Sequence, residues 1–276
     1  MFENLKKQLE TAINKAIEES YKNAAKTGRT TIPVEPKEDI ETPQELPENI
    51  YKNTFVLDNK KRYLQIAFNG DIYQVKKILP SLPFSERILI EAGTPFIKRE
   101  GLKGIRYISR IWGGNIVADL KTLDGAVAEV TEFSRAGATA ATVLGSAPKE
   151  TLDFFISACR QEKIISMIDM LGVEEPLKVL LKLKSKPDVV VLHKGRDEET
   201  ARGKVIKYKH VSKIKSKYDV LISAAGGIDL REARSAIFNG ANIIVANIVT
   251  ADDPWTGISS DEDVKTMAEQ FLSTIE

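Results

Sequence analysis

A short apolar segment followed by a helical stretch recurs eight times after residue 62, and this repeat constrains the fold more than any other feature. The apolar segments are Leu64–Phe68, Ile88–Ile90, Ile116–Ala118, Ala140–Leu144, Ile164–Ile168, Val189–Leu192, Val220–Ser223 and Ile243–Val245. Segments that are apolar along their whole length are typical of parallel strands covered on both faces. The stretches between them, such as Ala126–Ala136 and Lys149–Gln161, have the periodicity of helices.

Eight such βα units predict an α/β protein with a closed (β/α)₈ TIM barrel, and an open doubly wound sheet is the structural alternative. No GxGxxG follows the first strand, which argues against a dinucleotide-binding form of the open sheet. The length of 276 residues suits one barrel of about 250 residues with an addition. We therefore assign residues 61–276 to a catalytic barrel domain.

Residues 1–60 form a different region. Apolar side chains at helical spacing predict an amphipathic helix from about Glu3 to Ala25. The following TGRTTIPVEPKEDIETPQELPENI is rich in Pro, Thr and Glu and indicates an extended linker. Packing or self-association is the favoured role of the helix, and a binding arm for another macromolecule is the alternative.

The amino-acid composition argues against some classes of binding partner. The 40 Lys and Arg residues nearly balance the 39 Asp and Glu residues, so no overall charge favours nucleic acid or a membrane surface. The only cysteine, Cys159, cannot form an intrachain disulfide, which fits a reducing cytoplasm. Neither a signal peptide nor an apolar run of about 18 residues is present, so we expect a cytoplasmic protein without a membrane span.

Polar residues follow most of the predicted strands, and in such barrels the chemistry occurs where the strands end. These residues are Asn69, Glu91, Thr94, Asp119, Lys121, Asp124, Asp169, His193, Arg196, Gly226, Gly227 and Asn247. Ionisable groups after four separate strands predict one shared functional site rather than scattered helix caps and core histidines.

The segment IVADLKTLDGA is the most informative. Asp119 and Lys121 are two residues apart, so on a strand both point to the same side, and Asp124 follows at the start of the loop. Such a cluster keeps the lysine charged and places a proton donor near reacting carbons. A salt-bridge network at the barrel rim is the structural alternative.

Three further features add to the predicted site. Glu91 and Asp119, from neighbouring strands, are suitable Mg²⁺ ligands, or alternatively share a proton or bind a lysine. His193 at a strand end is interpreted as functional, whereas His210, in a Lys-rich stretch, is expected on a solvated helix face. The Gly226–Gly227 turn could cradle a phosphate after the seventh strand.

From about Tyr63 to Pro254, the segments LQIAFNGD, IEAGTPFIKREG, IVADLKTLDGA, TVLGSA, MIDMLGV, LHKGRDEETARG, AAGGI and VANIVTADDP resemble 3-hexulose-6-phosphate synthases. These belong to the orotidine 5′-phosphate decarboxylase suprafamily, as do 3-keto-L-gulonate 6-phosphate decarboxylases. The resemblance implies a (β/α)₈ barrel, a homodimer with active sites shared across the interface, and Mg²⁺ held by Glu91 and Asp119. It also implies that Lys121 lies beside the metal, that Asp124 serves the partner subunit and that His193 carries a proton.

The activity implied is that of an aldehyde lyase, a carbon–carbon lyase that joins formaldehyde to ribulose 5-phosphate reversibly through an enediolate. We assign catalysis to Asp119, Lys121, Asp124 and His193, and substrate binding to Asn69, Thr94, Asp169, Arg196, Gly226, Gly227 and Asn247. The expected partner is a small phosphorylated sugar or a related substrate, with neither nucleic acid nor membrane.

Three features depart from the synthase pattern. The family's first strand ends in aspartate, where this chain has Asn69, and its Gly-Arg pair after strand eight is Ala246-Asn247 here. Losing the arginine's contact with a phosphate costs roughly 1.5–3 kcal/mol unless another cation, from Lys194, Arg196 or Arg202, replaces it. Arg196 matches an arginine of the gulonate-phosphate decarboxylases, whereas a tyrosine is expected at this position in the synthases. A decarboxylase, and a barrel that only binds a ligand or partner, are therefore the alternative functions.

Overall fold

The computed structural model describes residues 56–200, 206–253 and 255–276. The predicted helix from Glu3 to Ala25 and nearly all of the predicted linker lie outside these residues. In the described part of the chain, no helix has the length and apolar character that a membrane crossing needs.

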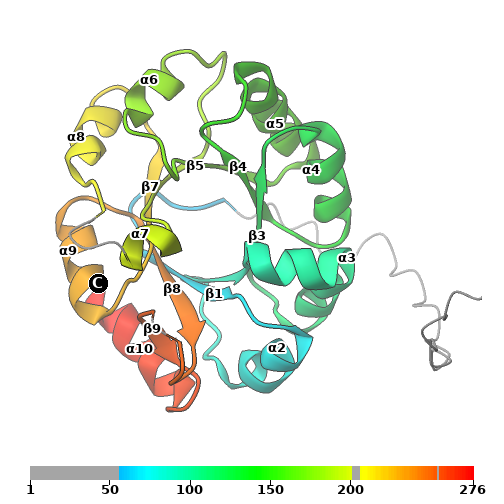
Figure 1. Cartoon of the computed structure of the whole chain (residues 1–276), viewed down its shortest axis with the longest axis vertical. Coiled ribbons are helices and arrows are strands. Elements are labelled where there is room, and N and C mark those ends of the chain that lie inside the picture. The colour runs from blue at the N-terminus through cyan, green and yellow to red at the C-terminus, as the bar shows by residue number, and fades with distance from the viewer. Residues whose placement is uncertain (1–55, 201–205, 254) are drawn as a thin grey trace, which may run out of the picture. The chain divides into compact units, whose positions relative to one another are not determined.

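Eight parallel strands form a closed barrel, as predicted (Figure 1). Each strand pairs with the next in sequence, and β1 pairs with β8 to close the ring. The strands are β1 (Tyr63–Phe68), β2 (Ile88–Ala92), β3 (Asn115–Thr122), β4 (Ala140–Leu144), β5 (Ile165–Asp169), β6 (Val189–His193), β7 (Leu221–Ala225) and β8 (Ile243–Val249). A short strand, β9 (Gly257–Ser259), pairs with the end of β8.

Helices surround this barrel (Figure 1). They are α2 (Ile72–Ile78), η1 (Leu79–Ser81), α3 (Thr94–Ile111), α4 (Ala126–Arg135), α5 (Lys149–Glu162), α6 (Pro176–Leu180), α7 (Arg196–Thr200), α8 (Lys209–Lys215), α9 (Leu230–Phe238) and α10 (Val264–Thr274). The two helices whose ends were predicted, α4 and α5, agree with the structure to within one residue.

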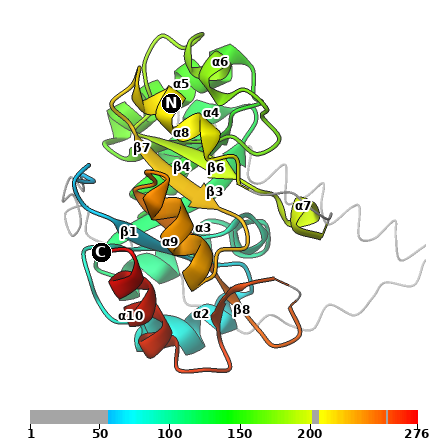
Figure 2. The same ribbon diagram turned by 90° about the vertical axis from the view of Figure 1, so that its left-hand side faces the viewer.

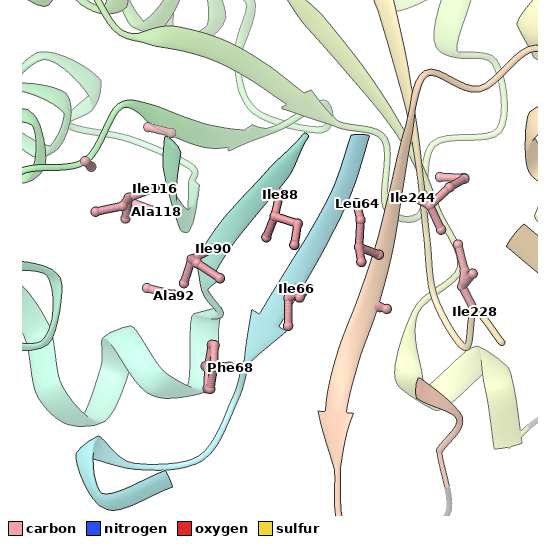
Figure 3. Close-up of a cluster of buried hydrophobic side chains, with 14 of the residues drawn as sticks. Leu64, Ile66, Phe68, Ile88, Ile90, Ala92, Ile116, Ala118, Ile228 and Ile244 are labelled. Carbon is pink, nitrogen blue, oxygen red and sulfur yellow. The ribbon is translucent and has the colours of Figure 1, made fainter. Parts of the chain in front are cut away.

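Alternate residues of each strand face opposite layers of the core. On β1, Leu64, Ile66 and Phe68 belong to the large apolar layer between barrel and helices, and Figure 3 shows their side chains beside those of β2. Tyr63 and Ala67 belong to a second cluster, inside the barrel. Both faces are therefore apolar, which explains why the strands appear in the sequence as continuous apolar runs.

Several strands extend beyond the apolar runs, because backbone hydrogen bonding continues where the side chains become polar. Glu91, Asp119, Lys121, Asp169, His193 and Asn247 consequently lie within strands rather than in the loops that follow them. Their side chains are therefore fixed by the barrel wall, which is more rigid than a loop.

His210 contradicts one expectation, because it is buried and not on a solvated face. It lies on α8 with Val211 and Ile214, which are also buried, while the lysines around them are exposed. The many lysines obscured this apolar stripe. Neither ring nitrogen of His210 has a hydrogen-bond partner among the described residues, and burial lowers the pKa of the imidazole.

Candidate active site

Asp119 on β3 is the centre of a hydrogen-bonded cluster at the C-terminal end of the barrel. Lys121 Nζ donates to both of its carboxylate oxygens, at 3.0 and 2.9 Å. The hydroxyls of Thr94 and Thr142 each donate to one oxygen at 2.8 Å. The carboxylate is 8% exposed, so these four bonds replace the water that an exposed aspartate would bind.

Asp169 on β5 extends the cluster to the other side of Lys121. One of its oxygens lies 2.9 Å from Lys121 Nζ and 2.8 Å from Nδ1 of His193. Its other oxygen accepts a hydrogen bond from the backbone N–H of Leu171 at 2.9 Å. An unbroken chain of polar contacts therefore runs from Asp119 through Lys121 and Asp169 to His193.

Mutual charge stabilises the ionised forms of Lys121, Asp169 and His193. Burial by itself would lower the pKa of Lys121, but Asp119 and Asp169 outweigh it and raise that pKa. Burial by itself would raise the pKa of Asp169, but His193 and Lys121 hold it well below its usual range. His193 is similarly disfavoured as a cation by burial, yet Asp169 raises its pKa above the ordinary value.

Glu91 on β2 lies beside this cluster, and none of the described residues forms an ion pair with it. Burial and repulsion by Asp119 raise its pKa to about 7. Gln65 Nε2 donates to it at 2.5 Å, while Gln65 Oε1 is buried without a hydrogen-bond partner among the described residues. Two neighbouring carboxylates and an unsatisfied amide oxygen are hard donors of the kind that Mg²⁺ uses. The donor set fits a divalent cation, although no group of three or more Asp, Glu, His or Cys residues suited to a metal occurs in the described part.

Lys121 has a strained backbone conformation at the point where its side chain enters the cluster. Its φ of 48° lies in the left-handed region, and the pairing of β3 with β4 shifts register between Ala118 and Thr122. A non-glycine residue in this region costs of order 1–3 kcal/mol, and such strain clusters at functional sites. Lys121 N donates to Thr142 Oγ1 at 3.0 Å, which helps to hold the conformation.

Two predicted substrate-binding residues pair with each other where β8 meets β1. Asn69 Nδ2 donates to Asn247 Oδ1 at 3.0 Å. A side chain at Gly93 would meet Asn69 Oδ1 at 2.2 Å, so glycine is required beside this pair. Both side chains of this pair are neutral amides. They can form hydrogen bonds with a substrate but no ionic contacts.

The loops after β6, β7 and β8 bring a second cation to the same end of the barrel. Gly226 and Gly227 both have positive φ, and a side chain at Gly226 would meet the backbone oxygen of Lys194 at 2.0 Å. The Arg196 guanidinium lies 4.4 Å from the centre of the Trp255 ring. Arg196 begins α7, which lies beyond the end of the barrel in Figure 2.

Asp124 is the one predicted catalytic residue that no described contact joins to this cluster. It is exposed, and its carboxylate accepts a hydrogen bond from the backbone N–H of Gly125 at 2.8 Å. Leu123 and Val127 on either side of it are 54% and 51% exposed, which is unusual for two nearby apolar side chains.

Three residues that contact the candidate active site were not predicted from the sequence. Gln65 and Thr142 face into the barrel from the middle of apolar strands, whereas only strand ends were considered. A polar residue inside an apolar strand was the available signal, because such a residue needs a partner. Trp255 carried no signal of this kind, since its contact with Arg196 depends on two loops meeting.

A closed (β/α)₈ barrel with a buried acid–lysine–acid–histidine chain at its strand ends has the architecture of an enzyme active site. The model of the orotidine 5′-phosphate decarboxylase / HUMPS family matches residues 63–256, and the chain belongs to this family. Within it, the chain resembles the 3-hexulose-6-phosphate synthases, as the sequence motifs indicated.

The chain is similar to the bifunctional enzyme Fae/Hps of Methanothrix thermoacetophila, with 37% identity over 215 residues that make up 77% of this chain and 52% of that enzyme. It therefore spans about half the length of the curated relatives it matches. The 3-hexulose-6-phosphate synthase of Salmonella typhimurium has the same fold, with a TM-score of 0.66, 23% identity, and coverage of 77% of this chain and 98% of that one. KGPDC from Streptococcus mutans has a TM-score of 0.64, 19% identity, and coverage of 78% of this chain and 97% of that one.

Proposed function

We propose that this chain is an aldehyde lyase of the 3-hexulose-6-phosphate synthase type, joining formaldehyde to ribulose 5-phosphate reversibly. The observation that carries the proposal is the hydrogen-bonded chain from Asp119 to His193, which holds an acid–base group beside a fixed cation. Similarity to the Fae/Hps enzymes supports it.

His193 is the proton carrier in this proposal. Its Nδ1 is occupied by Asp169, so Nε2 is the atom left to exchange a proton with substrate. Nε2 accepts a proton from a carbon of the ketose phosphate, which leaves an enediolate. The enediolate carbon attacks the carbon of formaldehyde, and the new alkoxide oxygen takes the proton back. Asp169 stabilises the imidazolium between the two transfers.

Glu91 and Asp119 would hold Mg²⁺. When bound, the ion would supply positive charge to the oxygens of the enediolate. Lys121 orients the Asp119 carboxylate, and Thr94 and Thr142 fix the same carboxylate from neighbouring elements. These contacts preorganise the acidic side of the site before a substrate arrives.

The substrate phosphate would bind at the end of β7. The backbone N–H groups of the Gly226–Gly227 turn would cradle it there, and Arg196, held against Trp255, supplies a cation that Asn247 does not. The Asn69–Asn247 pair would then meet hydroxyl groups of the sugar, because amides both donate and accept.

The site would be completed by a second copy of the chain. Asp124 is exposed and flanked by the exposed Leu123 and Val127, as expected of a residue that crosses a dimer interface. A homodimer sharing its active sites follows from this proposal.

The test is to incubate the full chain with ribulose 5-phosphate, formaldehyde and Mg²⁺ and to measure consumption of formaldehyde. Consumption that requires ribulose 5-phosphate supports the synthase. A Lys121→Ala variant is the matched control, because it removes the cation from the cluster. If the wild-type chain consumes no more formaldehyde than this variant, the synthase proposal is wrong.

One observation favours a second candidate of the same suprafamily. Arg196 reaches the mouth of the barrel, where it could stabilise an oxygen of a keto-gulonate phosphate after CO₂ departs. Release of CO₂ from that substrate, without formaldehyde consumption, would favour the decarboxylase. A binding role without catalysis would leave both reactions silent and leave the cellular phenotype unchanged by Lys121→Ala.

A further inference from the structure

A cavity lies at the opposite end of the barrel from Asp119 and Lys121. Its volume is about 450 Å³, within the range of small-molecule sites. Ile165 and Leu221, the first residues of β5 and β7, line it, so it opens at the N-terminal end of these strands. Ile156 and Ile164 add to its apolar wall.

Three cationic side chains line the same cavity. Arg160 and Lys163 come from the end of α5, and Lys186 comes from the connection between α6 and β6. None of the three forms an ion pair with a carboxylate in the described part of the chain. Lys186 Nζ donates to the backbone oxygen of Asp219 at 2.5 Å, which holds it at the cavity.

Lys163 adopts an unusual backbone conformation for its residue type. It caps α5 with a φ of 59°, in the left-handed region where glycine is the usual residue. Among the described non-glycine residues, only Lys121 and Lys163 have positive φ. The first lies in the candidate active site, and the second lines this cavity. The left-handed backbone is less favourable for a lysine than for a glycine, and at this position it places the lysine in the lining of the cavity.

Acceptors accompany the cations. Asp188 Oδ2 accepts hydrogen bonds from the N–H and the hydroxyl of Ser166, at 2.8 and 2.7 Å, which fixes its carboxylate beside the cavity. Asp219 lines the opening as well. The lining therefore combines an apolar wall, three cations and two acceptors.

We propose that this cavity is a ligand site for a small organic anion whose apolar body packs on Ile156, Ile164 and Ile165 and whose acidic group meets Arg160, Lys163 and Lys186. A hydroxyl or amine of the same ligand would donate to Asp188. The site is separate from the active site and does not depend on the activity proposed for it.

The fluorescent probe 8-anilinonaphthalene-1-sulfonate has this chemistry, because it joins apolar rings to one anionic group. Titration into the full chain is expected to give a saturable rise in fluorescence with one site per chain. Arg160→Gln, Lys163→Gly and Lys186→Gln should each weaken the Kd about threefold, as for partly exposed ion pairs, and together at least about tenfold. Lys163→Gly is the most informative variant, because glycine tolerates the left-handed backbone and the fold is retained.

Lys103→Gln is the matched control, since it removes one exposed lysine from α3, outside this cavity. The proposal is overturned by a chain that shows no saturable binding, or by equal Kd values for the triple variant and Lys103→Gln. Displacement of the probe by ribulose 5-phosphate with no effect of the triple variant would also overturn it, because the probe would then occupy the active site. Melting temperatures close to wild type confirm that each variant is folded.

Discussion

Replacing Asp169 by Asn should change both the stability and the pH dependence of this protein. The carboxylate accepts two charge-assisted hydrogen bonds, from Lys121 at 2.9 Å and from His193 at 2.8 Å. Such bonds contribute about 1.5–3 kcal/mol each, roughly twice as much as neutral ones. Asn preserves the shape but not the charge, so the variant should lose about 2–3 kcal/mol of unfolding free energy.

Part of this loss belongs to His193, because the variant removes the carboxylate that raises the histidine's pKa. A raised histidine pKa stabilises the fold below the unfolded pKa, and this stabilisation is lost as pH rises through the folded pKa. Without the charge of Asp169, burial and Lys121 lower the histidine's pKa, so in the variant the stability should no longer fall as pH rises through this range and should rise instead. If neutral His193 is the base, the acid limb of kcat/KM should also move to lower pH.

The assay is kcat/KM against pH for formaldehyde fixation, together with NMR titration of the His193 imidazole and thermal unfolding. Asp188→Asn is the control, because Asp188 is held by Ser166 at the far end of the barrel. A folded Asp169→Asn protein whose acid limb and histidine titration coincide with those of wild type would refute the reasoning.

Three further predictions concern the metal, the dimer and the phosphate. Mg²⁺ should raise the melting temperature of wild type but not of Glu91→Gln, and equal shifts would exclude Glu91 as a ligand. Inactive Asp124→Asn and Lys121→Ala chains, mixed and refolded together, should regain about a quarter of wild-type activity, because mixed dimers contain one intact site; no recovery would mean that Asp124 is not shared. Trp255→Leu should raise KM for ribulose 5-phosphate about fivefold, with kcat nearly unchanged, if the ~1 kcal/mol stacking contact positions Arg196. An unchanged KM would exclude this role.

Much of the fold could be predicted because both layers of the barrel are apolar. The alternation of Leu64, Ile66 and Phe68 with Tyr63 and Ala67 gives unbroken apolar runs that end where polar residues begin. The ends of the strands were less predictable, because hydrogen bonding continues through residues such as Asp119 and Lys121. His210 was misread because lysines at neighbouring positions masked the buried stripe of α8.

The closeness of Asp119 and Lys121 could be expected, because residues two apart share one side of a strand. Contacts between residues on distant strands could not be predicted from the spacing of neighbouring residues. The bond from Lys121 to Asp169 spans 48 positions, and the pairing of Asn69 with Asn247 spans 178. The left-handed backbone of Lys121 was also hidden, because a bulge depends on register with the neighbouring strand and not on residue type.

The charge balance of the cluster links its acid–base chemistry to a divalent cation. Three buried carboxylates, Glu91, Asp119 and Asp169, surround Lys121, and His193 adds a second cation only when protonated. With neutral histidine and all three carboxylates ionised, two negative charges remain uncompensated, which is the charge that Mg²⁺ would balance. Burial first, and this excess of negative charge second, raise the pKa of Glu91 to about 7, so the carboxyl takes up a proton where a cation would otherwise neutralise it. Metal binding and proton release at Glu91 should therefore be coupled, so the affinity of the wild-type chain for Mg²⁺ should rise with pH through about 7. Any weak affinity that remains in Glu91→Gln should not change with pH in this range.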